Sequence, residues 1–201
     1  MEWKLTNVIK ETDHPFLNYY TLVYDVKKDD GHHSYSYYIA SRRDEKKLRP
    51  VTNEYSRPDG VIIPTIYIDK DNKISFIFTR QFRPAINSYV YSVPAGLMDE
   101  DDDSIISTAI REVEEEVGAK VFEATELSVA RPTSSGLSDE FNAVVLAKVK
   151  EFSKQNLEEF EEISSIIVPL EEANDYLDNH KFALQPYFII KYLIEKLKAS
   201  N

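Results

Sequence analysis

Residues 111–119 read Arg-Glu-Val-Glu-Glu-Glu-Val-Gly-Ala, and this stretch gives the strongest indication of how the chain folds. Glu112, Glu115 and Glu116 are spaced by three and four residues, so a helix places their carboxylates on one face. These acids fall in the last turns of the predicted helix, where the macrodipole disfavours negative charge. A solvated acidic face is one interpretation. Bound divalent metal is the other, because a cation offsets the repulsion among the carboxylates.

Apolar residues in the same segment predict that the helix packs against a core. They recur at helical spacing, at Ile106, Ala109, Ile110, Val113 and Val117. Asp103 or Ser104 can cap the start of the helix, and Gly118 can supply a left-handed residue just past its end. We therefore expect a docked helix that holds its acidic face in place.

Extended upstream, this segment resembles the Nudix box, G-x5-E-x7-R-E-U-x-E-E-x-G-U, in which U is aliphatic. The matching residues run from Gly96 to Asp103 and, after seven further residues, from Arg111 to Ala119. One extra residue follows Gly96, and the first acid is Asp103, or Asp102 if the extra residue falls later, where the family has Glu. The half of the box that carries the metal ligands in this family is intact.

Three further motifs resemble the ADP-ribose pyrophosphatase branch of that family. They are Gln81-Phe82-Arg83-Pro84, the stretch Val93-Pro94-Ala95-Gly96-Leu97-Met98-Asp99, and Ser134-Ser135-Gly136-Leu137-Ser138-Asp139-Glu140. Their order and distances match those of the branch across roughly residues 60 to 170. Ser92 stands where the branch commonly has Glu, and Ser135 where it commonly has Pro. These departures weaken the assignment of the substrate.

The resemblance implies an α+β fold, the α/β/α sandwich of the Nudix fold, with a mixed β-sheet between helices and an added N-terminal β-hairpin. Residues 1–58 are expected to form this hairpin and a connector, as a dimerisation element, and residues 59–201 the Nudix hydrolase domain. Residue composition and turn signals predict strands at 18–26, 34–40, 61–67, 74–79, 89–93, 127–130, 141–149 and 163–168. They predict helices at 170–179 and 185–197 after the box helix. Residues 41–58 read as a loop that holds at most a short strand.

By resemblance, Glu112, Glu116 and the backbone carbonyl of Ala95 are direct metal ligands, and Glu115 is a ligand or a partner of one. Ligands that are all oxygen favour Mg²⁺ or Mn²⁺ over zinc. The resemblance makes Arg111 the residue that joins the loop to the helix through a box carboxylate. An ordinary i, i+4 pair with Glu115 fits its spacing equally well.

In the ADP-ribose branch the general base lies in a loop before the last strand, which makes Glu161 and Glu162 the candidates here. The alternative is that this acidic loop is merely solvated. Glu140 matches a family acid that closes over the metal, and Gly136 lies in the motif that approaches the nucleotide. Arg83 is the expected phosphate contact, because its planar guanidinium suits phosphate oxygens.

Composition fits a soluble catalytic domain of 201 residues, 42% hydrophobic and with a net charge of −11. That charge argues against binding to nucleic acid or to an anionic membrane. A phosphate substrate is compatible with it only if Mg²⁺ or Mn²⁺ bridges the two. The absence of cysteine excludes disulfides and thiolate chemistry. With neither a membrane-spanning run nor a secretory signal in the sequence, we expect a cytoplasmic protein.

The resemblance implies a Mg²⁺-dependent Nudix pyrophosphohydrolase, a homodimer acting on a small nucleoside diphosphate sugar. ADP-ribose is the first substrate expected, giving AMP and ribose 5-phosphate. A UDP-sugar or another nucleoside diphosphate derivative is the enzymatic alternative, which Ser135 favours. A Nudix-fold module that senses a nucleotide without cleaving it is the alternative of another class. A purely structural acidic protein would leave the motifs around Gly96 and Gly136 unexplained.

Overall fold

The computed structural model describes residues 1–99, 101–157, 159 and 161–199. The chain divides into two compact units, and each is described by itself. The first unit comprises Met1–Asp59 together with Ala130–Asn142, and the second comprises Gly60–Val129 and Ala143–Asn201. The sequence-based division at residues 58 and 59 did not include the returning segment 130–142 in the first unit. In the described part of the chain, no helix is long and apolar enough to cross a membrane.

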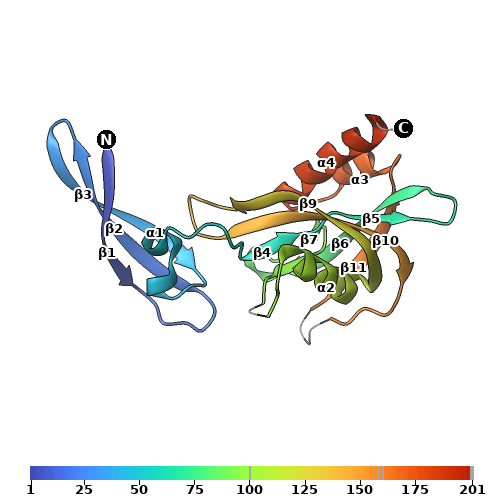
Figure 1. The fold of residues 1–201 in the computed structure, drawn as a ribbon, viewed down its shortest axis with the longest axis horizontal. Helices are drawn as coiled ribbons and strands as arrows, with labels where there is room; N and C mark the ends of the chain where they lie inside the picture. Colours follow the sequence, from blue (N-terminus) through green and yellow to red (C-terminus); the bar gives the residue numbers. More distant parts are fainter. Residues whose placement is uncertain (100, 158, 160, 200–201) are drawn as a thin grey trace. The chain divides into compact units, whose positions relative to one another are not determined.

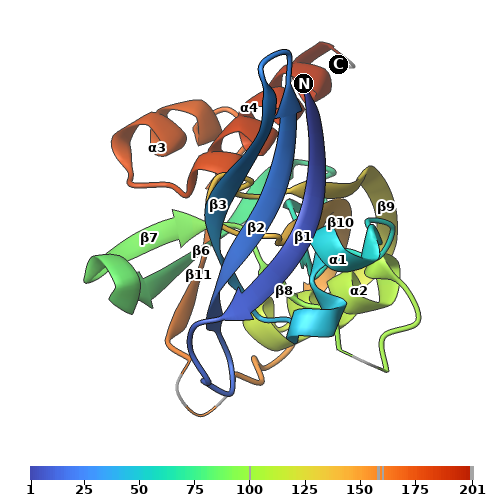
Figure 2. The ribbon, with the colours of Figure 1, turned by 90° about the vertical axis from the view of Figure 1, so that its left-hand side faces the viewer.

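The first unit contains an antiparallel sheet in the order β1-β2-β3 (Figure 2). Its strands are β1 (Glu2–Lys10), β2 (Asn18–Lys28) and β3 (Gly31–Ser41). The predicted hairpin of β2 and β3 is confirmed, with Gly31 at a φ of 126° in the turn. Strand β1 was not predicted, because a register shift between Leu5 and Asn7 interrupts its alternation of apolar and polar residues.

Two short helices follow this sheet where the sequence predicted a loop or a short strand. They are the 3₁₀-helix η1 (Glu45–Lys47) and the helix α1 (Arg49–Thr52). The reason is Arg49, which is only 2% exposed. Its guanidinium donates hydrogen bonds to the carbonyls of Glu54 at 2.6 Å and Arg57 at 2.7 Å, and to Asp59 at 2.9 Å. The connector therefore folds around one buried cation, the guanidinium of Arg49.

Residues 130–142 belong to the first unit through contacts with the same connector and sheet. The backbone N–H of Arg49 donates to Asp139, its guanidinium lies 4.5 Å from the ring centre of Phe141, and Ala40 forms a parallel bridge with Ser138. Asp59 in turn accepts a hydrogen bond from the backbone N–H of Phe141 at 2.8 Å.

The second unit is built on a mixed sheet in the order β11-β6-β5-β10-β4-β8, with β7 paired to β6 and β9 paired to β10. Its strands are β4 (Gly60–Ile62), β5 (Thr65–Ile68), β6 (Ile74–Arg83), β7 (Ser88–Ser92), β8 (Ala95–Leu97), β9 (Ala119–Pro132), β10 (Phe141–Phe152) and β11 (Ile163–Pro169). Between β6 and β7 lies the 3₁₀-helix η2 (Pro84–Ile86). Strands β5 and β10 are parallel, whereas β6 is antiparallel to both β5 and β11.

Helices cover both faces of this sheet (Figure 1). The helix α2 (Ile105–Val117) packs on one face, and α3 (Ala173–Asn179) and α4 (Leu184–Ala199) pack on the other. The alternation along β6 separates the two cores, because Phe76 and Phe78 point to α3 and α4 while Ile77 points to α2. The predicted α/β/α sandwich is confirmed.

Several predicted boundaries were wrong. The single strand predicted at residues 61–67 is divided between β4 and β5, because Pro64 has no N–H to donate to a neighbouring strand. Strand β9 runs far beyond the predicted residues 127–130. Helix α3 begins at Ala173 rather than at Leu170, because residues 170–172 form a turn after Pro169.

Candidate functional site

Helix α2 has well-defined ends, as the sequence predicted. Ser104 is the N-cap, and its hydroxyl accepts from the backbone N–H of Ser107 at 3.1 Å while Ser107 returns the contact, which forms a capping box. Gly118 ends the helix with a φ of 66°. Val113 and Val117 bury the opposite face in the core. Helix α2 is thereby held in one orientation about its own axis, and its acidic face is turned away from the core.

Two of the three glutamates lie against the strand that precedes the helix. Glu116 is only 7% exposed, and its carboxylate accepts a hydrogen bond from the backbone N–H of Ala95 at 3.2 Å. The carboxylate of Glu112 lies so close to Gly96 that a Cβ at residue 96 would overlap it. Glycine is therefore required at the start of the box so that this carboxylate can reach the backbone of β8.

Arg111 joins the loop to the helix and also pairs along the helix. Its guanidinium donates to the carbonyl of Leu97 at 3.1 Å and to Asp102 at 2.9 Å. It also donates to Glu112 at 2.8 Å and to Glu115 at 3.1 Å. The two roles considered for Arg111 thus occur together. Of the two loop acids considered for the first acidic position of the box, Asp102 is therefore the one that bonds Arg111.

The surroundings of Glu112 and Glu116 disfavour the charged form of both carboxyl groups. Burial raises the pKa of Glu116 to about 8, and the charge of Glu112 adds to this effect. Burial also raises the pKa of Glu112, although Arg111 opposes the shift. A cation beside these carboxylates would return both groups to their charged form.

The donor set suits a hard divalent cation, because it consists of carboxylate oxygens and the carbonyl of β8. In residues 1–99, 101–157, 159 and 161–199, no three acidic or histidine side chains form a ready coordination set. Glu112 and Glu115 bond Arg111, and Glu116 bonds the N–H of Ala95. The buried, raised-pKa carboxylates around Gly96 nevertheless fit Mg²⁺ or Mn²⁺.

The two candidate bases are in different surroundings. Glu162 is exposed and accepts a hydrogen bond from the hydroxyl of Tyr89 at 3.1 Å, and the guanidinium of Arg80 lies 3.6 Å from the centre of that ring. Glu161 is half-buried, and its charge contributes to the raised pKa of both Glu112 and Glu116. Glu161 is therefore near enough for its charge to act on Glu112 and Glu116, while Glu162 is held by Tyr89 of β7.

Arg83, the predicted phosphate contact, is exposed at the end of β6. Its positive charge acts on Glu116 in the direction that lowers the pKa of that carboxyl. Arg83 and the acidic face of α2 are therefore close enough to interact.

The other two predicted substrate contacts, Gly136 and Glu140, lie in the first unit. The carbonyl of Gly136 accepts from the hydroxyl of Tyr37 at 3.1 Å. Glu140 forms an ion pair with Arg42 and accepts from the hydroxyl of Thr133 at 2.8 Å. Together with Arg43 and Asp59, the pair of Arg42 and Glu140 lines a cavity of about 270 Å³ within that unit.

Sequence reasoning missed Gln155. Its side-chain amide donates to the backbone carbonyl of Glu116 and lies 3.4 Å from the carbonyl of Ile163, the first residue of β11. No local pattern marks this residue, because its partners come from two elements distant in the sequence.

A family model described as the NUDIX domain matches residues 56–188. The methanol dehydrogenase activator of Bacillus methanolicus is 32% identical over 117 residues, which are 57% of this chain and 61% of that protein. Nudix hydrolase 14, chloroplastic, of Arabidopsis thaliana is 38% identical over 56 residues, 28% of this chain and 18% of that protein. The chain thus spans less than two thirds of either relative.

A solved structure described as that of an ADP compounds hydrolase superposes with a TM-score of 0.72. The superposition covers 100% of this chain and 97% of that one at 18% sequence identity, which shows a shared fold.

Proposed function

This chain belongs to the NUDIX family, and from that premise we propose that it is a Mg²⁺-dependent hydrolase of the diphosphate linkage in a nucleoside diphosphate sugar. ADP-ribose is the first substrate proposed, with AMP and ribose 5-phosphate as products. The observation that carries the proposal is the buried Glu116 carboxylate, with a pKa raised to about 8, held against Ala95 and beside Glu112.

Glu112, Glu116 and the carbonyl of Ala95 would hold the metal, with Glu115 as a further ligand or a partner of one. When bound, Mg²⁺ supplies positive charge for the phosphates and a lowered pKa for the attacking water. Arg111 keeps the loop and the helix in register through Leu97 and the carboxylates that it bonds. Burial has already removed much of the hydration of these carboxylates, which would favour a cation beside them.

Hydrolysis requires that a bond form between water oxygen and one phosphorus while the bond from that phosphorus to the bridging oxygen breaks. Glu161 is the proposed base, since its charge acts on both Glu112 and Glu116, and it would take the proton from the water. Arg83 would bind phosphate oxygens through its planar guanidinium. Glu162, bonded to Tyr89, would instead support the loop.

Two observations bear on the choice of nucleotide. The superposed structure is described as an ADP compounds hydrolase, which favours an ADP derivative. Ser135 leaves the loop before Gly136 less rigid than a proline would, which is the reason to test a UDP-sugar beside ADP-ribose. Gly136 and Glu140 are the residues proposed to contact this part of the substrate.

The test is an assay of ADP-ribose, UDP-glucose, NADH, diadenosine polyphosphates and coenzyme A with Mg²⁺ and product identification. We expect ADP-ribose to be cleaved best. Glu116→Gln should lower kcat by about a hundredfold or more. Glu114→Gln, which changes an exposed acid in the same run, should leave turnover intact. Failure of all five substrates, or an unchanged Glu116→Gln enzyme, would overturn the proposal.

The relative named methanol dehydrogenase activator favours a second candidate, a Nudix-fold module that binds a nucleotide and acts on another protein. This candidate predicts saturable binding of a nucleotide in calorimetry with no product formed over hours. Product formation on the same nucleotide would exclude it.

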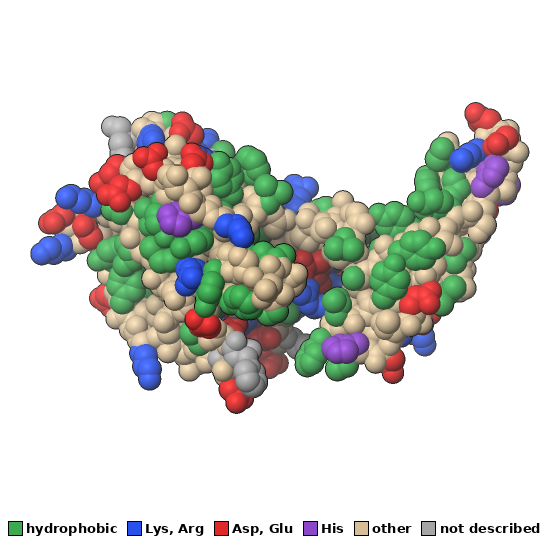
Figure 3. Space-filling view, turned by 180° about the vertical axis from the view of Figure 1, so that it is seen from behind, with side chains coloured by type: hydrophobic (Ala, Val, Ile, Leu, Met, Phe, Trp, Pro, Cys, Tyr) green, Lys and Arg blue, Asp and Glu red, His purple; other side chains and the backbone are tan. Residues whose placement is uncertain are grey.

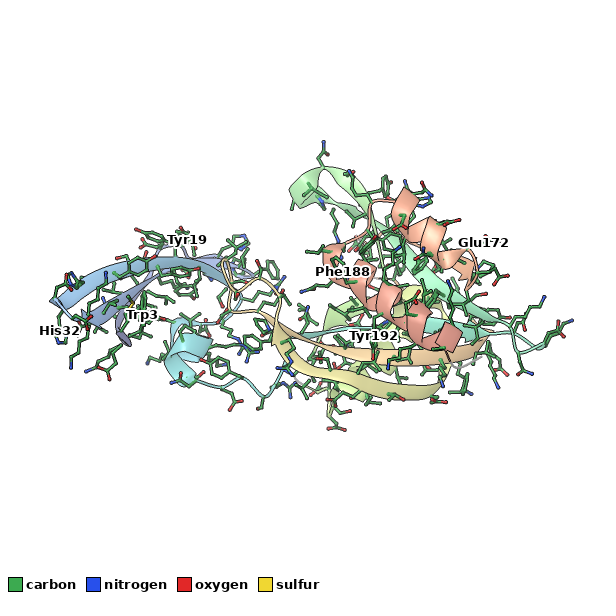
Figure 4. The ribbon with its side chains drawn as sticks, turned by 90° about the horizontal axis from the view of Figure 1, so that it is seen from above. Trp3, Tyr19, His32, Glu172, Phe188 and Tyr192 are labelled. Atoms are coloured by element: carbon green, nitrogen blue, oxygen red, sulfur yellow. The ribbon has the colours of Figure 1, made fainter. Side chains whose placement is uncertain are left out.

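The proposed enzyme acts as a homodimer in the cytoplasm. Exposed aromatic side chains on the sheet of the first unit support a self-association surface there. Tyr19 and Tyr38 stack at 6.2 Å on one face and are 44% and 55% exposed, which makes that face the proposed surface. Figure 3 shows hydrophobic side chains gathered over this sheet, and Figure 4 shows Trp3 and Tyr19 on opposite faces of it.

A further inference from the structure

Gln155 connects the backbone of a box glutamate to the strand that follows the acidic loop. Its amide donates to the carbonyl of Glu116 and lies 3.4 Å from the carbonyl of Ile163 and 3.3 Å from the hydroxyl of Ser165. Ile163 follows Glu161 by two residues. One side chain therefore spans the interval between the metal-binding helix and the candidate base.

The segment that carries Gln155 is seated against the end of α2. The backbone N–H of Asn156 donates to the carbonyl of Glu115 at 3.0 Å, and Ser153 donates to the carbonyl of Gly118. The carbonyl of Glu115 lies in the last turn of α2, where it has no partner within the helix, and Gly118 is the residue that ends the helix. A Cβ at residue 118 would lie 2.7 Å from the backbone nitrogen of Gln155, so glycine is needed for this close approach.

We propose that Gln155 is a positioning residue for the hydrolysis, which limits the distance between Glu116 and Glu161 by bonding the backbone of Glu116 and that of Ile163, two residues after Glu161. The inference rests on the proposed function. Catalysis is sensitive to such placement, because a displacement of about 1 Å at a reacting group costs up to about a hundredfold in rate. Gln155 touches neither the water nor the phosphates in this scheme, and it acts through Glu161.

A role limited to capping α2 predicts something different. Loss of a cap would lower stability and affect every property of the site together. Loss of positioning would lower kcat while substrate and metal binding are retained, because the ligands on α2 are held independently by Ala95 and Arg111.

The experiment compares the wild-type chain with Gln155→Met, which keeps the length of the side chain and removes its donor. We expect kcat for ADP-ribose to fall about tenfold or more, with KM and Mn²⁺ affinity in electron paramagnetic resonance changed less than about threefold. Asn156→Ala is the matched control, since its contact with Glu115 runs through the backbone, and it should behave as wild type. Equal kcat in Gln155→Met and wild type would overturn the inference.

A double-mutant cycle tests whether Gln155 acts through Glu161. In a Glu161→Gln background, Gln155→Met should cause no further loss of kcat. Additive losses would overturn the inference and leave the proposed function standing. A wild type that cleaves none of the five substrates would overturn both. If circular dichroism shows Gln155→Met to be unfolded, Gln155→Asn, which shortens the amide by one methylene, must show the same selective fall in kcat.

Discussion

At the scale of single residues, Gly96 leaves no room for a Cβ beside the carboxylate of Glu112. Gly96→Ala would force either this carboxylate or β8 to move, so we expect kcat to fall about tenfold or more and Mg²⁺ affinity to weaken. Steady-state kinetics over a Mg²⁺ titration would measure both. Leu97→Ala is the control, because Arg111 bonds only the backbone of that residue. A fully active Gly96→Ala enzyme would show that Glu112 does not need this position.

The pKa of Glu116 gives a prediction about stability and pH. Its folded-state pKa of about 8 lies above its ordinary value of 4.5, so the metal-free folded state retains a proton that the unfolded state releases. Stability contributed by the protonated form is present at low pH and is lost as pH rises from 4.5 to 8. Glu116→Gln should remove this loss, which amounts to at most ~1.4 kcal/mol per pH unit.

Denaturant unfolding with chelator between pH 5 and pH 8 would test this prediction. Glutamine keeps an acceptor for the N–H of Ala95, so the fold should persist in the variant. Added Mg²⁺ should stabilise the wild type and leave the variant unaffected. If the free energy of unfolding depends on pH in the same way in both metal-free proteins, Glu116 is already charged in the folded state.

At the scale of single elements, the ends of α2 determine how firmly the acidic face is held. Ser104→Ala removes a hydroxyl that accepts from Ser107, and it should cost ~1 kcal/mol of unfolding free energy. Ser104→Thr keeps the acceptor and should cost less. Thermal unfolding of the three proteins would measure the difference. Equal stability of all three would show that the capping box contributes nothing to the fold.

Helix α2 also shows what the sequence could predict. Its apolar stripe, its cap and its terminal glycine are all local signals, and both boundaries follow from them. The β2–β3 hairpin was predictable for the same reason, because Asp29-Asp30-Gly31 marks the turn. Strand β1 escaped prediction because its bulge breaks the alternation on which such predictions depend.

The candidate site was predictable only in part. The three glutamates share a face because of helical spacing, which is a local property. The surroundings that separate Glu161 from Glu162 are not local, since Tyr89 holds Glu162 from another strand. Gln155 is the extreme case, because its partners lie in α2 and β11 and nothing in the adjoining residues marks it.

At the scale of the whole molecule, the proposed dimer gives a further prediction. Tyr19→Ser with Tyr38→Ser removes the exposed stacked pair on the sheet of the first unit, and it should convert the dimer to a monomer. Phe188→Ser is the control. Phe188 lies on α4 beside the exposed Tyr192 (Figure 4), is 61% exposed, and belongs to the second unit.

Light scattering at micromolar concentration would give the mass of each protein. A monomeric wild type would count against the dimer. If Phe188→Ser is a monomer while the tyrosine variant remains a dimer, the interface lies on α4 instead.

The first unit is assembled from two separate stretches of chain, since Ala130–Asn142 joins Met1–Asp59. During synthesis, the buried side chain of Arg49 emerges from the ribosome long before Asp139 and Phe141, which complete its surroundings. The first unit therefore cannot complete its fold until the segment that carries Glu112, Glu115 and Glu116 has been translated. For the same reason, a single cut near residue 59 cannot release this unit intact, and any transplant of it to another protein must carry both stretches.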